Sequence, residues 1–153
     1  MLNLRASLCA GLAAAVVSTL AQVAAWIAFT DAFPAILWRD ARFAAAIVLG
    51  KTALDDTHSF ATVWVAATVV HFALSIAYAM LLGVALRKST RLAAVLAGTF
   101  FGALIFVVNM HLLTRYFPWF IEARDPITLA AHVVFGVTAA LVYRRLDSRS
   151  RSC

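Results

Sequence analysis

Long apolar stretches alternate with short polar segments along this chain. A transmembrane helix needs about 20 apolar residues. Four stretches free of Asp, Glu, Lys and Arg meet or approach that length: Ala6–Thr30, Thr57–Leu86, Leu92–Thr114 and Pro126–Tyr143. We therefore predict an all-α bundle of four transmembrane helices, at about residues 7–30, 60–86, 92–113 and 126–145. These spans use most of the chain, so residues 1–153 are expected to form a single membrane domain.

A fifth apolar segment, Phe43–Gly50, is too short to cross a bilayer. Arg39 and Arg42 precede it and Lys51 follows it, at positions suited to lipid headgroups. We predict a short interfacial helix at about residues 41–50, on the outer side of the membrane.

The chain contains two similar phrases, RDARFAAAIVLG at 39–50 and RDPITLAAHVVFG at 124–136, and each comes after a Phe-Pro step. Both halves would begin on the same side of the membrane, so the match suggests an internal parallel repeat. Chance similarity between two Ala-rich segments is the alternative. In the second phrase, Asp125 is a predicted N-cap with Pro126 at the first helical position. We interpret both Arg-Asp pairs as interfacial caps and anchors.

The first apolar stretch could be a secretory signal that is cleaved near Thr19–Ala21. It continues, however, through Trp26 and Phe29, which makes it long enough to span. We expect an uncleaved first transmembrane helix.

Composition agrees with a membrane protein and narrows its chemistry. The chain is 64% hydrophobic and 13% charged, with a mean hydropathy of +0.91. The net charge of +6 does not indicate nucleic-acid binding, because the basic residues lie at the ends of predicted helices. The two cysteines, Cys9 and Cys153, form no disulfide framework or metal-binding motif.

Basic residues are distributed unequally between the two sides of the predicted topology. The side with both termini holds eight Lys and Arg residues and one acidic residue, whereas the other holds five and six. Cytoplasmic loops carry the excess of Lys and Arg. We predict a multi-pass bacterial inner-membrane protein with both termini in the cytoplasm.

Each predicted span carries one stripe of small or polar residues at helical spacing, as expected for helices that face one another. These stripes are Gly11, Ala15, Ser18 and Gln22; Trp64, Thr68, His71, Ser75 and Tyr78; Gly98, Gly102, Ile105 and Asn109; and Thr128, His132, Gly136, Ala139 and Tyr143. Four polar members, Gln22, His71, Asn109 and His132, fall in the outer half of the bundle. They form the candidate polar cluster.

Three interpretations of this cluster are open. In the first, the polar groups hydrogen-bond between helices and the protein is a structural or accessory membrane component. In the second, an oligomer forms a path for protons or small solutes. In the third, His71 and His132 bind haem or a metal, although their predicted depths differ by about 7 Å. No Asp or Glu lies in the spans and no catalytic motif is present, so we do not predict an enzyme and expect no cofactor.

Gly98 and Gly102 form a GxxxG motif, which allows two helices to approach closely. The motif favours either a homo-oligomer or a larger membrane complex, or tight packing within one chain. The lipid bilayer is the one partner that the composition itself requires.

Several segments together, among them RDARFAAAIVLG, HFALSIAYAMLLGVALR, GALIFVVN and AHVVFGVTAALVYR, are similar to a family of small four-helix bacterial inner-membrane proteins. The resemblance runs from about Trp38 to Arg144. Most members of that family have no assigned activity, and some carry a sodium:proline symporter label. The resemblance implies a four-helix membrane fold, and it assigns no role to any residue.

Overall fold

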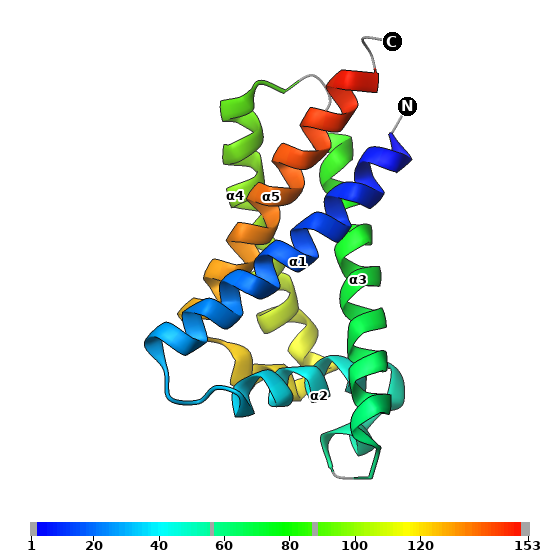
Figure 1. Ribbon diagram of the computed structural model, residues 1–153, viewed down its shortest axis with the longest axis vertical. Helices are drawn as coiled ribbons and strands as arrows, with labels where there is room; N and C mark the ends of the chain where they lie inside the picture. The colour runs from blue at the N-terminus through cyan, green and yellow to red at the C-terminus, as the bar shows by residue number, and fades with distance from the viewer. Residues whose placement is uncertain (1–2, 56, 87–88, 151–153) are drawn as a thin grey trace.

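The four predicted spans form four long helices in the computed structural model, which describes residues 3–55, 57–86 and 89–150 (Figure 1). These helices are α1 (Leu4–Phe29), α3 (Phe60–Ala85), α4 (Arg91–Val107) and α5 (Pro126–Ser150). The structure has four helices that are long and apolar enough to cross a membrane, counting α4 with its extension to Arg115. The described residues contain no strand. The predicted all-α, four-span fold is confirmed.

A side-chain cap sets the start of each long helix. The side chains of Asn3, Ser59, Thr90 and Asp125 accept hydrogen bonds from the backbone N–H three residues later, at 2.9–3.2 Å. Such caps satisfy N–H groups that have no partner within the helix. The predicted N-cap role of Asp125, with Pro126 beginning α5, is confirmed.

The short helix exists but is longer than predicted. Helix α2 covers Ala35–Leu49 and so begins six residues before the expected start at residue 41. The prediction counted only the apolar run and missed the preceding turn, in which Ile36 and Trp38 donate backbone hydrogen bonds to Ala32 and Pro34. Helix α2 lies across one end of the bundle (Figure 1). The start of α1 and the end of α5 lie at the opposite end, which we call the terminal end.

Small residues decide how the long helices pack. A Cβ atom on Gly98 would lie 2.5 Å from the Gly136 carbonyl oxygen, and one on Gly11 would lie 2.7 Å from the Ile76 Cα. A Cβ atom on Gly102 would lie closer still to the His132 carbonyl oxygen. The GxxxG motif of α4 is therefore covered by α5 within the same chain, and it is not free to form a homo-oligomer.

The connection between α4 and α5 is made of short irregular turns. A π turn at Val108–Leu112 and a 3₁₀ turn at Leu113–Arg115 continue α4, and a second 3₁₀ segment spans Pro118–Ala123. Trp119 Nε1 in that segment donates to the Phe43 carbonyl at 3.1 Å. This contact ties the connection to α2, which also packs on α3 through Ala41, Ala45, Val63 and Ala67. Together these segments close the α2 end of the bundle.

Candidate functional site

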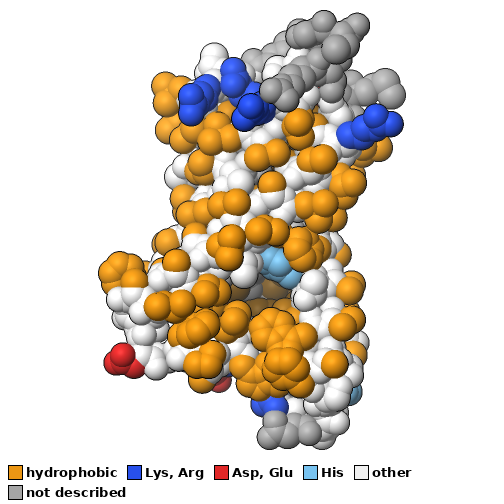
Figure 2. Space-filling model, viewed as in Figure 1, with side chains coloured by type: hydrophobic (Ala, Val, Ile, Leu, Met, Phe, Trp, Pro, Cys, Tyr) orange, Lys and Arg blue, Asp and Glu red, His pale blue; other side chains and the backbone are white. Residues whose placement is uncertain are grey.

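Helices α1 and α3 meet near Gly11 and Ile76 and separate towards the α2 end (Figure 1). The space-filling view shows a hollow where they separate, above α2, with histidine atoms at its edge (Figure 2). Since α1 and α3 are both candidate spans, this hollow lies on the side of the bundle that lipid would surround. Helix divergence therefore produces an opening that a uniformly packed bundle would lack.

Two neighbouring cavities lie at this opening and share five lining residues. The first, which we call the bundle cavity, has a volume of about 290 Å³ and is lined by residues of all five helices. The second, the lateral cavity, has a volume of about 330 Å³ and lies between α1, α2 and α3. Both are lined by Thr19, Gln22, Asp40, Ala44 and His71.

All four members of the candidate polar cluster, Gln22, His71, Asn109 and His132, line the bundle cavity. The structure therefore brings together side chains from α1, α3, the π turn and α5 that are far apart in the sequence. Their assignment as a functional site remains a prediction.

His71 is the most accessible of the four. It is exposed on α3, and its Nε2 lies 3.2 Å from the Thr19 hydroxyl and 3.5 Å from the Ala15 carbonyl oxygen, both on α1. These contacts cross the gap where α1 and α3 begin to separate. His71 thus marks the boundary between the packed part of the α1–α3 interface and the opening.

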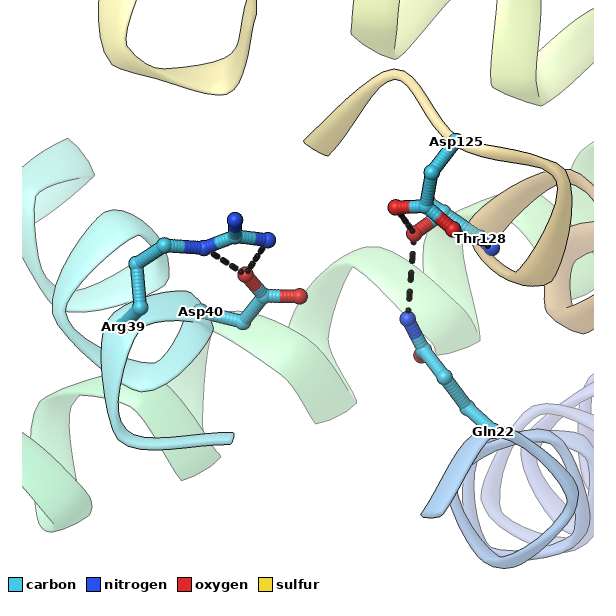
Figure 3. Close-up of polar contacts among 5 residues, drawn as sticks. All are labelled: Gln22, Arg39, Asp40, Asp125 and Thr128. Atoms are coloured by element: carbon cyan, nitrogen blue, oxygen red, sulfur yellow. Dashed lines mark hydrogen bonds and ion pairs between the residues drawn. The ribbon is translucent and has the colours of Figure 1, made fainter. Parts of the chain in front are cut away.

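His132 and Gln22 belong to a hydrogen-bonded group around Thr128 at the start of α5. His132 Nδ1 lies 2.8 Å from the Thr128 carbonyl oxygen, and Gln22 Nε2 donates to the Thr128 hydroxyl at 3.3 Å. That hydroxyl in turn donates to Asp125 Oδ2 at 2.8 Å (Figure 3). This group connects the last third of α1 to the capped start of α5.

Asn109 lies in the π turn that follows α4, and its Oδ1 accepts a hydrogen bond of 2.7 Å from the Tyr78 hydroxyl on α3. A π turn places side chains at angles that a regular α-helix does not allow, and such turns are frequent at functional sites. Here the turn aims Asn109 at α3 across the bundle cavity.

Asp40 is the lining residue that the sequence interpretation missed. It was expected to be an interfacial anchor, but it lies within α2, lines both cavities and leaves only 22% of its side chain exposed. Its Oδ1 accepts hydrogen bonds from Arg39 Nε and Nη2 at 2.9 and 2.8 Å. Its other oxygen points away from Arg39, into the space before Gln22 and Thr128 (Figure 3). Asp40, Ala44 and Ile47 share one face of α2, and this spacing was the available signal.

Burial raises the pKa of the Asp40 carboxyl above its ordinary value of 3.8. The adjacent Arg39 guanidinium opposes this effect, and the negative charge of Asp125 adds to it. Asp40 and Asp125 are therefore close enough for their charges to repel.

The two Arg-Asp pairs have different structures. Arg39 and Asp40 form an ion pair, whereas Arg124 donates to the Met110 carbonyl and, at 2.9 Å, to the Thr114 hydroxyl. Arg124 thus fixes the α4–α5 connection, while Asp40 of the first pair belongs to the cavity wall. The repeated phrase occurs in a short transverse helix and in a spanning helix, so similar sequences here serve unlike elements.

The chemistry available to this arrangement is binding through hydrogen bonds, charge and apolar contact. No group of three or more His, Cys, Asp or Glu side chains placed to hold a metal ion occurs in the described part of the chain, so the metal interpretation gains no support. Apolar side chains, including Leu74, Ile105 and Phe135, form most of the remaining wall of the bundle cavity.

Comparison with known proteins assigns no function to these cavities. No family model, curated protein or solved structure matches the chain. The fold and the four candidate spans together identify a multi-pass, all-α membrane protein, with a largely apolar cavity that holds the candidate polar cluster at its α2 end.

Proposed function

We propose that this protein binds a small amphipathic molecule in the bundle cavity and admits it from the bilayer through the lateral cavity. The observation that carries this proposal is the pair of neighbouring cavities, which share polar side chains from α1, α2 and α3 at an opening between two candidate spans. Binding, and not catalysis, is the role we assign.

The exposure of His71 favours ligand binding over a purely structural role for the cluster. A polar side chain that faces lipid is costly, and polar residues within spans usually point into the bundle or into a water-filled cavity. A histidine needed only to join α1 to α3 would be better placed in their packed interface. Its exposure at the opening suits a group that an entering molecule contacts.

The lining also has the composition of a ligand site. Small-molecule pockets combine mostly apolar walls with a few placed polar groups, and their volumes begin at about 300 Å³. The bundle cavity, at about 290 Å³, has apolar walls and a polar set of Gln22, Asp40, His71, Asn109, Thr128 and His132. A ligand with an apolar body and one polar group would match both parts.

A path across the membrane is less well supported than binding. The lining residues lie in the α2 half of the bundle, while the terminal half is filled by a core that includes Ala10, Leu82, Ala94 and Tyr143. Transport would require this core to open. We therefore place the proton or solute path and the haem site behind ligand binding, and we keep a structural or accessory role as the alternative.

The unequal distribution of basic residues supports an orientation with both termini in the cytoplasm. In the bacterial inner membrane, the α2 end and both cavities would then face the outer leaflet. The ligand would enter from that leaflet. The resemblance to small inner-membrane proteins is consistent with this placement.

Blocking the cavities tests the proposal. Ala44 lines both cavities, so Ala44→Trp should occupy them, whereas Val48→Trp, one turn later on α2, adds the same ring at a position that is 61% exposed and lines neither. Suitable radiolabelled probes are benzyltrimethylammonium, its uncharged isostere neopentylbenzene and the anion phenylmethanesulfonate. Each is measured on protein in nanodiscs, with empty nanodiscs subtracted.

We expect at least one of these probes to bind saturably to the wild type and to Val48→Trp, and its binding to be lost in Ala44→Trp. Equal binding of every probe to the two tryptophan variants, or no saturable binding to the wild type, would overturn the proposal and leave the structural role.

A further inference from the structure

We infer that the molecule bound in the bundle cavity is a monovalent organic cation with an apolar body, its charge held by the free carboxylate oxygen of Asp40. This inference rests on the proposed function and names the ligand class for the same site. It is drawn from the charge and geometry at the α2 end of the cavity.

The first step is the orientation of Asp40. Both hydrogen bonds from Arg39 reach the same oxygen, Oδ1. The second oxygen is directed into the space between α2 and the Gln22–Thr128 pair (Figure 3). A carboxylate oxygen can accept more than one hydrogen bond. Asp40 can therefore keep its ion pair and still meet a cation from the cavity.

The second step is the local balance of charge. Asp40 and Asp125 repel each other, and Arg39 is the one guanidinium that the structure places on either carboxylate among the described residues. The neighbouring basic side chains point to other partners: Arg42 Nη1 donates to the Leu54 carbonyl at 3.0 Å, and Arg124 to Met110 and Thr114. Among the described residues, one guanidinium, paired with Asp40, thus stands against two neighbouring carboxylates, and a bound cation would relieve their repulsion.

The third step concerns the polar groups around the free oxygen. Gln22 donates through its nitrogen to Thr128, which leaves its amide oxygen as an acceptor. Thr128 uses its hydroxyl proton on Asp125. The side of the cavity formed by Asp40 and Gln22 therefore presents oxygen acceptors, which favour a cationic group over an anionic one.

The fourth step is the apolar part of the wall. Phe117, Phe120 and Phe135 line the bundle cavity, and Trp64 and Phe72 line the lateral cavity. Aromatic rings attract organic cations such as quaternary ammonium groups while also contacting apolar bodies. An inorganic cation keeps a tightly bound hydration shell and has no apolar body to contact these rings. The combination selects an organic cation that can also partition into the bilayer.

The three probes introduced above test this inference because they share a similar shape and differ in charge. We expect benzyltrimethylammonium to bind wild-type protein at least about tenfold more tightly than neopentylbenzene or phenylmethanesulfonate, a factor that corresponds to about 1.4 kcal/mol. Asp40→Asn should weaken binding of the cation by about tenfold or more and leave binding of neopentylbenzene unchanged. The matched control is Glu122→Gln, an exposed acid that lines neither cavity, which should alter neither.

The outcomes separate this inference from the proposed function. If the probes bind alike and Ala44→Trp blocks them all, the cavity binds ligands but the preference for cations is wrong. If the cation is preferred and Asp40→Asn has no effect, the assignment to Asp40 is wrong. If Asp40→Asn also loses binding of neopentylbenzene, this variant no longer isolates the effect of charge. The test is then whether the wild type prefers benzyltrimethylammonium over the other two probes, and the lack of that preference overturns the inference. If Ala44→Trp blocks none of the probes, the proposed function itself is wrong.

Discussion

At the scale of single residues, the unusual feature is an acidic side chain that is mostly buried. Asp40 sits in a wall otherwise made largely of apolar groups, and burial favours its protonated form. The ion pair with Arg39, whose side chain is 30% exposed, offsets only part of that effect. A residue kept at a cost to stability is a candidate for function.

This view predicts how Asp40→Asn changes the pH dependence of stability. Because the pKa of Asp40 is higher in the folded protein than its ordinary 3.8, its contribution to stability is full below that value and is lost as the pH rises through the folded-state pKa. The free energy of unfolding of wild type minus that of Asp40→Asn should therefore fall as the pH rises from the ordinary pKa of 3.8 through the higher folded-state pKa. The groups near it, Arg39, Asp125, His71 and His132, are present in both proteins.

Unfolding in mild detergent by increasing denaturant, followed by tryptophan fluorescence, provides the measurement. Asp40→Asn should be at least as stable as wild type at neutral pH. A variant that is less stable than wild type at neutral pH, and equally stable in acid, would show that Asp40 supports the fold.

At the scale of elements, the packing of α4 on α5 depends on glycines whose missing Cβ atoms leave room for backbone. Gly98→Ile would place its side chain against the Gly136 and Val137 backbone, which cannot move aside as a flexible side chain can. We expect a loss at the upper end of the about 1–3 kcal/mol typical of overpacked sites. Thr99→Ile, an exposed neighbour on the same turn, should cost much less.

Reversible unfolding in detergent would measure both variants. Their oligomeric state should stay the same, because the Gly98 face is used within the chain. Similar stability of the two variants would contradict the packing described here, and a change of oligomeric state in Gly98→Ile alone would return the GxxxG motif to an interface between chains.

The sequence was sufficient to predict the long helices because their apolar length and capping residues are local signals. It also grouped Gln22, His71, Asn109 and His132, since helical spacing places each on a bundle-facing stripe. It could not reveal that α1 and α3 separate, because that depends on how α2 fills one end of the bundle. For the same reason Asp40 was assigned to the interface, and the early start of α2 was missed.

At the scale of the whole molecule, the distribution of charged side chains between the two ends of the bundle favours one orientation in the membrane. The start of α1 and the end of α5 lie at the terminal end, where Lys and Arg side chains gather on the visible face (Figure 2). Asp and Glu side chains are seen towards the α2 end. Basic residues on one side of a membrane protein favour the cytoplasm.

Topology reporters test this orientation directly. Fusions after Ser89 and at the C-terminus should report the cytoplasm, and an insertion after Asp55 should report the periplasm when the protein is expressed in a Gram-negative bacterium. A truncated chain ending at Ala123 gives a matched control, since removal of α5 should leave its reporter in the periplasm. A periplasmic signal from the full-length C-terminus would reverse or break the proposed topology.

The central claim is that a ligand occupies the bundle cavity and the lateral cavity, and photolabelling in lipid tests it most directly. A diazirine derivative of benzyltrimethylammonium would be activated on the wild-type protein in nanodiscs, and the labelled peptides mapped. We predict labels around the shared lining residues of α1, α2 and α3, competed by unlabelled probe and absent from Ala44→Trp. Labels confined to the lipid-facing surface of α4, near Leu96 and Phe100, and unaffected by competitor would contradict the claim.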